Sequence, residues 1–209
     1  MAGEFDLIAR HFSTAVAHTD LGVGDDAALM SPRPGMQLVV SSDMLVAGTH
    51  FLPEVEPWLL GWKTAAVNIS DIAAMASEPR WITLALSLPA ADEPWVSALA
   101  QGFHACCQRH GVDWVGGDTT RGPLNLCATV FGEVPRGEAV RRDGARPGDD
   151  IWVSGAPGLA ALGLASLLDS LDLGEHQAAC LSRLQQPIPR VALGLALRGV
   201  ASAMLDVSD

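Results

Sequence analysis

Lysine is almost absent from this chain of 209 residues, and Lys63 is the single example. Lysine and arginine together number 13 against 24 aspartates and glutamates, which gives a formal net charge of −11. A chain this acidic repels phosphate backbones and anionic lipid surfaces, which excludes the typical nucleic-acid and membrane-surface binders. If the protein handles phosphorylated molecules, something positive other than lysine must offset the repulsion.

Long hydrophobic runs and cysteine patterns are missing as well. The richest apolar stretch, residues 158–168, is far shorter than the roughly 20 residues that a membrane helix needs, and the first residues have no secretory signal pattern. The cysteines fit neither a CxxC pair nor a zinc site, and we expect them to be reduced core residues; they are Cys106, Cys107, Cys127 and Cys180. These absences favour a soluble cytoplasmic protein.

Familiar nucleotide-binding motifs are also absent. Lys63-Thr64 lacks the glycines of a phosphate-binding loop, and the protein-kinase motifs are missing. The segment 22–27 superficially fits the dinucleotide pattern GxGxxA. Its two aspartates would repel a pyrophosphate, and the residues that follow favour an extended chain over a helix. A phosphoryl-transfer enzyme of this composition would depend on metal ions and arginine.

Helix and strand patterns alternate along the chain, which predicts an α/β fold with enough apolar residues for a packed core. We predict helices over 4–12, 57–77, 92–111 and 158–171, then two more helical stretches, and strands over 37–43, 81–88, 112–115, 125–134, 151–154 and 204–209. A stretch rich in Gly, Arg and Pro over 136–150 marks a domain boundary. We therefore divide the chain into an N-terminal domain (1–137), a linker (138–150) and an incomplete C-terminal domain (151–209).

Acidic residues gather at strand ends and beside glycines in three places: Gly24-Asp25-Asp26, Ser41-Ser42-Asp43 and Gly117-Asp118-Thr119. Carboxylate and hydroxyl oxygens are the ligands that Mg²⁺ prefers, and loops at strand ends can bring them together. Each cluster alone favours a turn, since Asp, Ser and Gly are all common in turns. Together they favour a metal site.

Three single residues each allow a functional and a purely structural interpretation. Asp71 lies in an apolar helical segment and needs a metal or other partner, unless it belongs to a solvated stripe. Arg142 could hold phosphates through its forked guanidinium, or belong to a solvated linker. His50 could contact substrate, although a lone histidine is usually structural or solvated.

Six short motifs follow one another along the chain: Gly3-Glu-Phe-x-Leu-Ile-Ala-Arg10, Gly22-x-Gly-Asp-Asp-x-Ala28, Ser42-Asp-x-Leu-Val-Ala-Gly-x-His-Phe51, Ala66-Val-Asn-x-Ser-Asp-x-Ala-Ala-Met75, Gly116-Gly-Asp-Thr-Thr-Arg-Gly-Pro123 and Leu205-Asp-Val-Ser-Asp209. In order and spacing they resemble the thiamine-monophosphate kinase family from end to end. The resemblance implies ATP-dependent phosphorylation of thiamine monophosphate to thiamine diphosphate. It also implies a fold like that of aminoimidazole-ribonucleotide synthetase: an N-terminal α/β (α+β) domain with a mixed sheet and flanking helices, which forms a homodimer through its sheet, and a second α/β domain.

The resemblance also assigns roles to individual residues. His50 would contact thiamine monophosphate, and ATP would be bound by Gly117, Asp118, Arg142 and Ser208. The implied ligands of Mg²⁺ are Asp26, Ser41, Ser42, Asp43, Asp71, Asp118, Asp206 and Asp209. Members of the family often carry Thr where Ser42 stands, and the hydroxyl is retained. No residue is implied as a covalent nucleophile, so we expect direct in-line phosphoryl transfer.

Two alternatives remain open. One is another ATP-using enzyme of the same fold, such as a selenophosphate synthetase, an aminoimidazole-ribonucleotide synthetase or a hydrogenase-maturation protein. The selenophosphate synthetases carry a reactive Cys or selenocysteine and a Lys near the N-terminus, and this chain has no Cys before Cys106 and no Lys before Lys63. The other is a non-catalytic nucleotide-binding or dimerisation fragment. The family continues beyond the last motif, and we expect a truncated chain.

Overall fold

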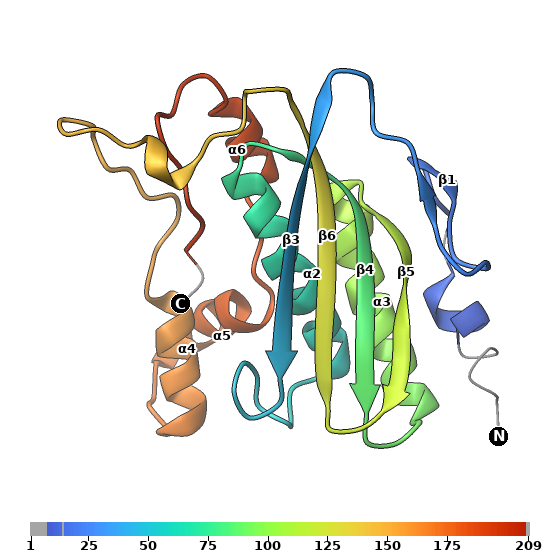
Figure 1. Ribbon diagram of the computed structural model, residues 1–209. Coiled ribbons are helices and arrows are strands. Elements are labelled where there is room, and N and C mark those ends of the chain that lie inside the picture. Colours follow the sequence, from blue (N-terminus) through green and yellow to red (C-terminus); the bar gives the residue numbers. More distant parts are fainter. Residues whose placement is uncertain (1–7, 14, 208–209) are drawn as a thin grey trace.

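The computed structural model describes residues 8–13 and 15–207, and its centre is a mixed four-stranded sheet (Figure 1). The strands lie in the order β3 (Met36–Val46), β6 (Asn125–Pro135), β4 (Glu78–Leu88) and β5 (Asp113–Arg121). β6 is antiparallel to both of its neighbours, while β4 and β5 are parallel. The mixed sheet predicted from the sequence is confirmed, and β3 and β5 form its two edges.

Two long helices, α2 (Pro57–Ala74) and α3 (Glu93–His110), cover one face of the sheet (Figure 1). Each begins with an acidic side chain that accepts a hydrogen bond from a free helical amide: Glu56 from Leu59 N in α2, and Asp92 from Trp95 N in α3. A proline follows in the first turn, where its missing N–H costs nothing. α3 ends at Gly111, whose positive φ of 65° suits a glycine cap.

The helices pack unusually close together through two glycines. A Cβ atom at Gly61 would lie 2.0 Å from the carbonyl oxygen of Leu99, and one at Gly102 would lie 1.8 Å from that of Trp58. The two backbones therefore touch where α2 and α3 cross. Behind them, Phe103 packs on Trp114 of β5 with ring centroids 4.6 Å apart, within a single apolar core between helices and sheet.

The opposite face of the sheet carries apolar side chains that nothing in the described chain covers. Along β3, alternate residues point away from the helices, and Leu38, Val40 and Met44 are 50%, 55% and 54% exposed. Their neighbours Val39 and Leu45 face α2 and belong to the core. We call the side of the sheet opposite α2 and α3 the open face.

One end of the open face is covered by residues 17–33, which we call the hairpin segment. It contains β1 (Thr19–Leu21) and β2 (Leu29–Met30), and β1 lies beside β5 (Figure 1). The Gly22–Ala28 loop is followed by the strand β2, whereas a dinucleotide site would need a helix there. Of the helix predicted over 4–12, residues Ile8–Phe12 form a π-helical turn, η1, and 1–7 lie outside the described residues.

After β6 the chain continues through η2 (Arg142–Gly144), α4 (Leu159–Leu168), η3 (Gly174–His176), α5 (Gln177–Gln185) and α6 (Val191–Ala196). The strand predicted over 151–154 is wrong, because Ile151 and Trp152 are 95% and 88% exposed and pair with no strand in the described chain. Residues 204–207 form no strand either, while 208–209 lie outside the described residues. No helix in the described part of the chain is long and apolar enough to cross a bilayer.

The last part of the chain packs against α2. The indole Nε1 of Trp62 donates to the carbonyl oxygen of Pro187 at 2.8 Å, and the backbone at Gly194 lies against Ala73. The Nε of Arg198 donates to the carbonyl oxygen of Ala76 at 3.0 Å. Residues 187–198 are therefore joined to the sheet-and-helix unit, and the division into domains 1–137 and 151–209 stays a prediction.

All four cysteines are free thiols. Cys106, Cys107 and Cys180 are buried, as expected of reduced core residues, and burial raises the pKa of the Cys106 thiol to about 12. Such a thiol is not nucleophilic at neutral pH. Cys127 differs, since it is half-buried on the open face.

Candidate active site

Asp43 and Asp71 lie close together at the β3 edge of the sheet. In β3, Ser41 and Asp43 share the face that turns toward α2. The Ser41 hydroxyl donates to Asp71 Oδ2 at 2.5 Å, and the main-chain N–H of Asp43 donates to Asn68 Oδ1 at 3.1 Å. The apolar residues around Asp71 pack α2 on the sheet. Asp71 itself lies at the boundary between the core and the surface, where it faces β3, the strand that carries Asp43.

Asp206 joins this pair from the far end of the chain. Burial raises the pKa of Asp206, and the charges of Asp71 and Asp43 raise it further. The pKa of Asp43 is raised in the same way, by burial first and by the charge of Asp71 second, while His50 acts in the opposite direction. The acidic cluster Asp43–Asp71–Asp206 thus concentrates negative charge at one place.

The chemistry of this cluster fits a hard divalent cation. None of its three carboxylates forms an ion pair within residues 8–13 and 15–207. No three acidic, imidazole or thiol groups of the described residues are close enough to hold an ion unaided. Mg²⁺ is typically held by one or two carboxylates together with substrate phosphates, so it does not require a closed protein cage. Asp43, Asp71 and the Ser41 hydroxyl are suitable ligands for such an ion.

The raised pKa values predict how stability depends on pH without metal. A carboxyl whose folded-state pKa is raised stabilises the fold fully below its unfolded pKa, and this stabilisation is lost as the pH rises through the folded pKa. We therefore expect Asp206→Asn to be more stable than the parent at pH 7 in EDTA, by less than about 1 kcal/mol because the site is partly solvated. The difference should vanish near pH 3. Urea unfolding at both pH values tests this, and a variant less stable at pH 7 would contradict it.

Ser42 lies on the other side of the sheet from Asp43. Its hydroxyl bonds to the carbonyl oxygen of Ala128 at 3.1 Å and to the Thr129 hydroxyl at 2.9 Å, on the open face. Successive side chains of a strand point in opposite directions, so Ser41 and Ser42 cannot both reach the acidic cluster. Any contact between Ser42 and an ion held by Asp43 would have to come from its main chain.

Asn68 has a structural role that the sequence did not assign to it. It is fully buried, accepts the Asp43 N–H and donates to the Thr64 carbonyl oxygen at 2.9 Å. The side-chain amide of Asn68 holds the backbone of Asp43 against α2, near Asp71. The signal in the sequence was its place three residues before Asp71, on the same side of the helix.

His50 is exposed in the turn after β3, next to the acidic cluster. Its Nδ1 accepts the N–H of Val46 at 3.0 Å, so a neutral ring carries its proton on Nε2. The single lysine lies beside His50: Lys63 Nζ donates a hydrogen bond to the His50 carbonyl oxygen at 3.3 Å. Burial lowers the pKa of Lys63. His50 can therefore present an N–H donor to a ligand bound along α2.

Asp26 and Asp118 lie elsewhere, at the β5 edge of the sheet. Asp43, Ala128, Leu84 and Gly117 form one row across the four strands. Three strand spacings of about 4.8 Å separate Asp43 from Gly117 by roughly 14 Å. Asp118 is the next residue and aligns with Ala85 on the open face, and exposed Asp26 belongs to the hairpin segment beside β5. Within one chain, the structure brings together only part of the predicted metal site.

The predicted ATP contacts are also spread apart. A Cβ atom at Gly117 would lie 1.8 Å from the carbonyl oxygen of Leu84, so a glycine is needed for β5 to pair with β4 there. Arg142 is exposed in η2, while its neighbour Arg141 is paired with Asp143 through two hydrogen bonds. Ser208 and Asp209 lie outside the described residues.

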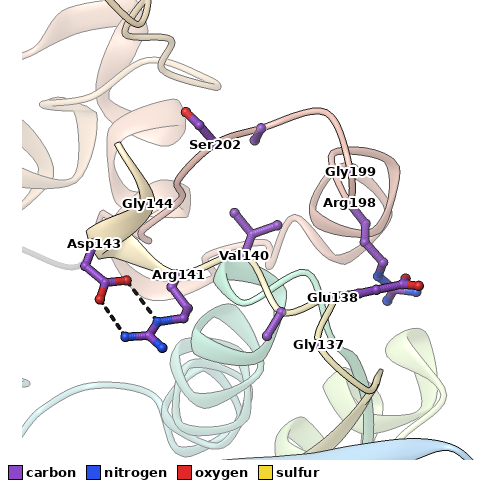
Figure 2. Close-up of a pocket in the computed structure, with 11 residues that line it drawn as sticks. Gly137, Glu138, Val140, Arg141, Asp143, Gly144, Arg198, Gly199 and Ser202 are labelled. Carbon is purple, nitrogen blue, oxygen red and sulfur yellow. Dashed lines mark hydrogen bonds and ion pairs between the residues drawn. The ribbon is translucent and has the colours of Figure 1, made fainter. Parts of the chain in front are cut away.

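A hollow of about 650 Å³ lies between the linker and the loop after α6 (Figure 2). Residues 137–141, Asp143 and Gly144 line one side, and Arg198, Gly199 and Ser202 line the other. The Arg141–Asp143 pair lies on its rim. The acidic cluster is not among the lining residues, so this hollow is separate from the candidate metal site.

Comparisons with known proteins identify the family. Residues 24–134 match the family described as AIR synthase related protein, N-terminal domain. The chain is 45% identical to thiamine-monophosphate kinase of Salmonella typhimurium over 99% of this chain and 65% of the relative. It is similar to the crystal structure of thiamine-monophosphate kinase from Stenotrophomonas maltophilia, with a TM-score of 0.86 and 50% identity over 92% of this chain and 63% of that one.

A second similar structure is described as AaThiL complexed with AMPPCP and TMP, with a TM-score of 0.77 and 29% identity over 96% of this chain and 64% of that one. The chain spans about 65% of the length of the Salmonella relative. The family match, residues 24–134, covers the four strands of the sheet except the last residue of β6, and both helices packed on it. It includes the positions of Asp26, Asp43, Asp71 and Asp118. The chain belongs to the AIR synthase related proteins.

Proposed function

We propose that this protein transfers the γ-phosphoryl group of ATP to thiamine monophosphate, giving thiamine diphosphate and ADP. The observation that carries the proposal is the acidic cluster Asp43–Asp71–Asp206, without a basic partner in the described chain, in a protein 45% identical to thiamine-monophosphate kinases. The crystal structure of AaThiL with AMPPCP and TMP supports the pair of substrates. Magnesium ions, when bound, supply the positive charge that lets two anions approach a protein of net charge −11.

The residues of this chain bind and orient the substrates in the proposed reaction. Asp43 and Asp71 would hold Mg²⁺ at the β3 edge, where its charge would offset that of the phosphates, and His50 would donate a hydrogen bond to thiamine monophosphate. Arg142 binds ATP phosphates through its guanidinium, Gly117 contacts ATP through its backbone, and Ser208 also contacts ATP. A phosphate oxygen of thiamine monophosphate attacks the γ-phosphorus in line, the bond to the bridging oxygen breaks, and ADP leaves. The acceptor phosphate is largely ionised, since its second pKa is about 6, so no strong base is needed.

A homodimer would complete the site, and the proposal includes one. Asp118 and the hairpin segment lie at the β5 edge, whereas the acidic cluster lies at the β3 edge, roughly 14 Å away. If two open faces stack about a twofold axis parallel to the strands, the β5 edge of one chain lies over the β3 edge of the other. Each site would then combine Asp26 and Asp118 of one chain with Asp43, Asp71 and Asp206 of its partner, and since the latter three lie on the helix side of β3, the two groups would meet around the β3 edge.

The open face has the properties that such an interface needs. Leu38, Val40 and Met44 are about half exposed on the edge strand β3, and Ala85 and Cys127 continue the apolar surface across β4 and β6. Two sheets that stack in this way lie about 10 Å apart, which buries these side chains. Asp118, on the same face, would project toward the partner.

The function is tested by incubating the 209-residue chain with ATP, Mg²⁺ and thiamine monophosphate and measuring thiamine diphosphate by chromatography. The matched positive control is the full-length Salmonella relative. With γ-labelled ATP, we expect label in thiamine diphosphate and none on the protein. A labelled protein would exclude direct transfer. Mg²⁺-dependent ATP binding without product, in the presence of an active control, would support the non-catalytic alternative.

A further inference from the structure

Two buried carboxylates outside the candidate site, Asp113 and Glu133, hold the two ends of the hairpin segment. Asp113 begins β5 and is 6% exposed; Glu133 is near the end of β6 and is 1% exposed. Both belong to the side of the sheet that forms the open face. A buried carboxylate is costly unless it is hydrogen-bonded, so the contacts that it makes show what it stabilises.

Asp113 binds the start of the segment. Its two oxygens accept the N–H of Ala17 at 2.9 and 3.0 Å, and Oδ2 also accepts the N–H of His18 at 2.6 Å and the Thr19 hydroxyl at 2.7 Å. Burial raises the pKa of Asp113, but these hydrogen bonds, with the charge of His18, outweigh it and leave the pKa below the usual value. The ionised carboxylate therefore fixes Ala17 and His18, just before β1, and Thr19, its first residue.

Glu133 binds the end of the segment. Its Oε1 accepts the N–H of Arg33 at 2.6 Å, and its Oε2 accepts Arg33 Nε at 2.6 Å. The same guanidinium bonds to Glu78, and Arg80 Nε lies 3.5 Å from Glu133 Oε2. The two arginines near Glu133 offset its charge, and the carboxylate in turn fixes Arg33, three residues before β3 begins.

The residues between these two anchors have little packing of their own. β1 and β2 span three and two residues, and Leu29 is 57% exposed. A two-stranded hairpin is marginally stable by itself in water. Asp25 and Asp26 lie at the exposed turn of this hairpin. Their position relative to β5 and Asp118 thus depends on hydrogen bonds at the two ends.

We propose that Asp113 and Glu133 are positioning residues that fix the hairpin segment so that Asp26 can serve the metal site. The proposal rests on the proposed function for the role of Asp26, but the anchoring itself does not. Neither residue touches substrate or metal: each acts through the backbone of residues 17–19 or Arg33. The sequence carries one signal, a single acidic residue within each of the apolar runs 112–115 and 125–134.

The first test measures hydrogen exchange of the 209-residue chain by mass spectrometry. Asp113→Asn gives up one acceptor oxygen and turns an amide toward the N–H groups of Ala17 and His18. We expect peptides from residues 17–33 to exchange about tenfold faster or more, while α2 and α3 keep their protection. Asp169→Asn is the control, an exposed carboxylate after α4. Thr19→Val removes one hydrogen bond without unpairing Asp113, and should give the same change to a smaller extent.

The second test measures the Mg²⁺ concentration that half-saturates ATP binding, by calorimetry. We expect about a tenfold rise for Asp113→Asn and for Glu133→Gln, as for Asp26→Asn, and no change for Asp169→Asn or Glu175→Gln. Unchanged exchange of residues 17–33 in both Asp113→Asn and Thr19→Val would overturn the proposal, as would a loss of protection spread evenly over the core in Thr19→Val. If Asp26→Asn leaves the Mg²⁺ dependence unchanged while exchange behaves as expected, the assigned role of Asp26 fails and the anchoring stands.

Discussion

Replacing Asp43 by asparagine is expected to abolish the formation of thiamine diphosphate, with a loss of about a thousandfold. The substitution keeps the size of the side chain and the hydrogen bond from the Asp43 N–H to Asn68, which is made by the main chain. It removes one of the two carboxylates that face each other between β3 and α2. Since Mg²⁺ binds few carboxylates per site, the loss of one leaves phosphate charge without compensation.

The Asp43→Asn variant must be compared with a matched substitution and with its own stability. Asp169→Asn, at an exposed position, should retain full turnover. Loss of the Asp43 charge relieves repulsion from Asp71, so the variant should unfold at no lower urea concentration than the parent in EDTA. A near-normal rate in Asp43→Asn would remove this residue from the metal site and with it the observation on which the proposed function depends.

Mixing two inactive variants is expected to restore activity if each site is shared between two chains. Asp43→Asn damages the β3 half of a site and Asp118→Asn damages the β5 half. In a mixed dimer, one site receives both substitutions and the other receives neither. Random exchange of subunits makes half of the dimers mixed and half of their sites intact, which gives about a quarter of the parent activity.

The control for this experiment mixes Asp43→Asn with Asp71→Asn. Both substitutions fall in the same half of the site, so every site in every dimer carries at least one, and no activity should return. The mixtures are refolded together from urea to allow exchange, and each variant is also refolded alone. Recovery in the control mixture, or none in the Asp43→Asn and Asp118→Asn mixture when light scattering shows dimers, would contradict a shared site.

The local signals in the sequence predicted most of the sheet and its helices. Pro57 and Asp92–Gly111 marked helix ends because caps and breakers act within a few residues, and the apolar runs at 81–88 and 125–134 became the two central strands. The strand predicted at 151–154 failed for the opposite reason. Its residues have strand propensity, but a strand exists only when another backbone pairs with it, and none does so in the described chain.

For the site, residue types by themselves identified the acidic clusters, and the single lysine led to the prediction that the protein depends on a metal. Sequence could not separate Ser41 from Ser42, which the pleat of β3 sends to opposite faces, nor show that Asn68 holds the Asp43 backbone. It also grouped Asp26 and Asp118 with Asp43, since motifs carry no distances. That two strands lie between them followed only from strand order.

The chain's own composition and motifs therefore determined its fold class and its family resemblance and predicted a need for cations, because these depend on residue type and short-range spacing. The tertiary structure alone decided which carboxylates meet. Asp206 reaches Asp71 across 135 positions of sequence, and Asp113 and Glu133 reach the hairpin segment across about 100. Contacts at such separations arise from the packing of the whole sheet and its helices, which no local pattern encodes.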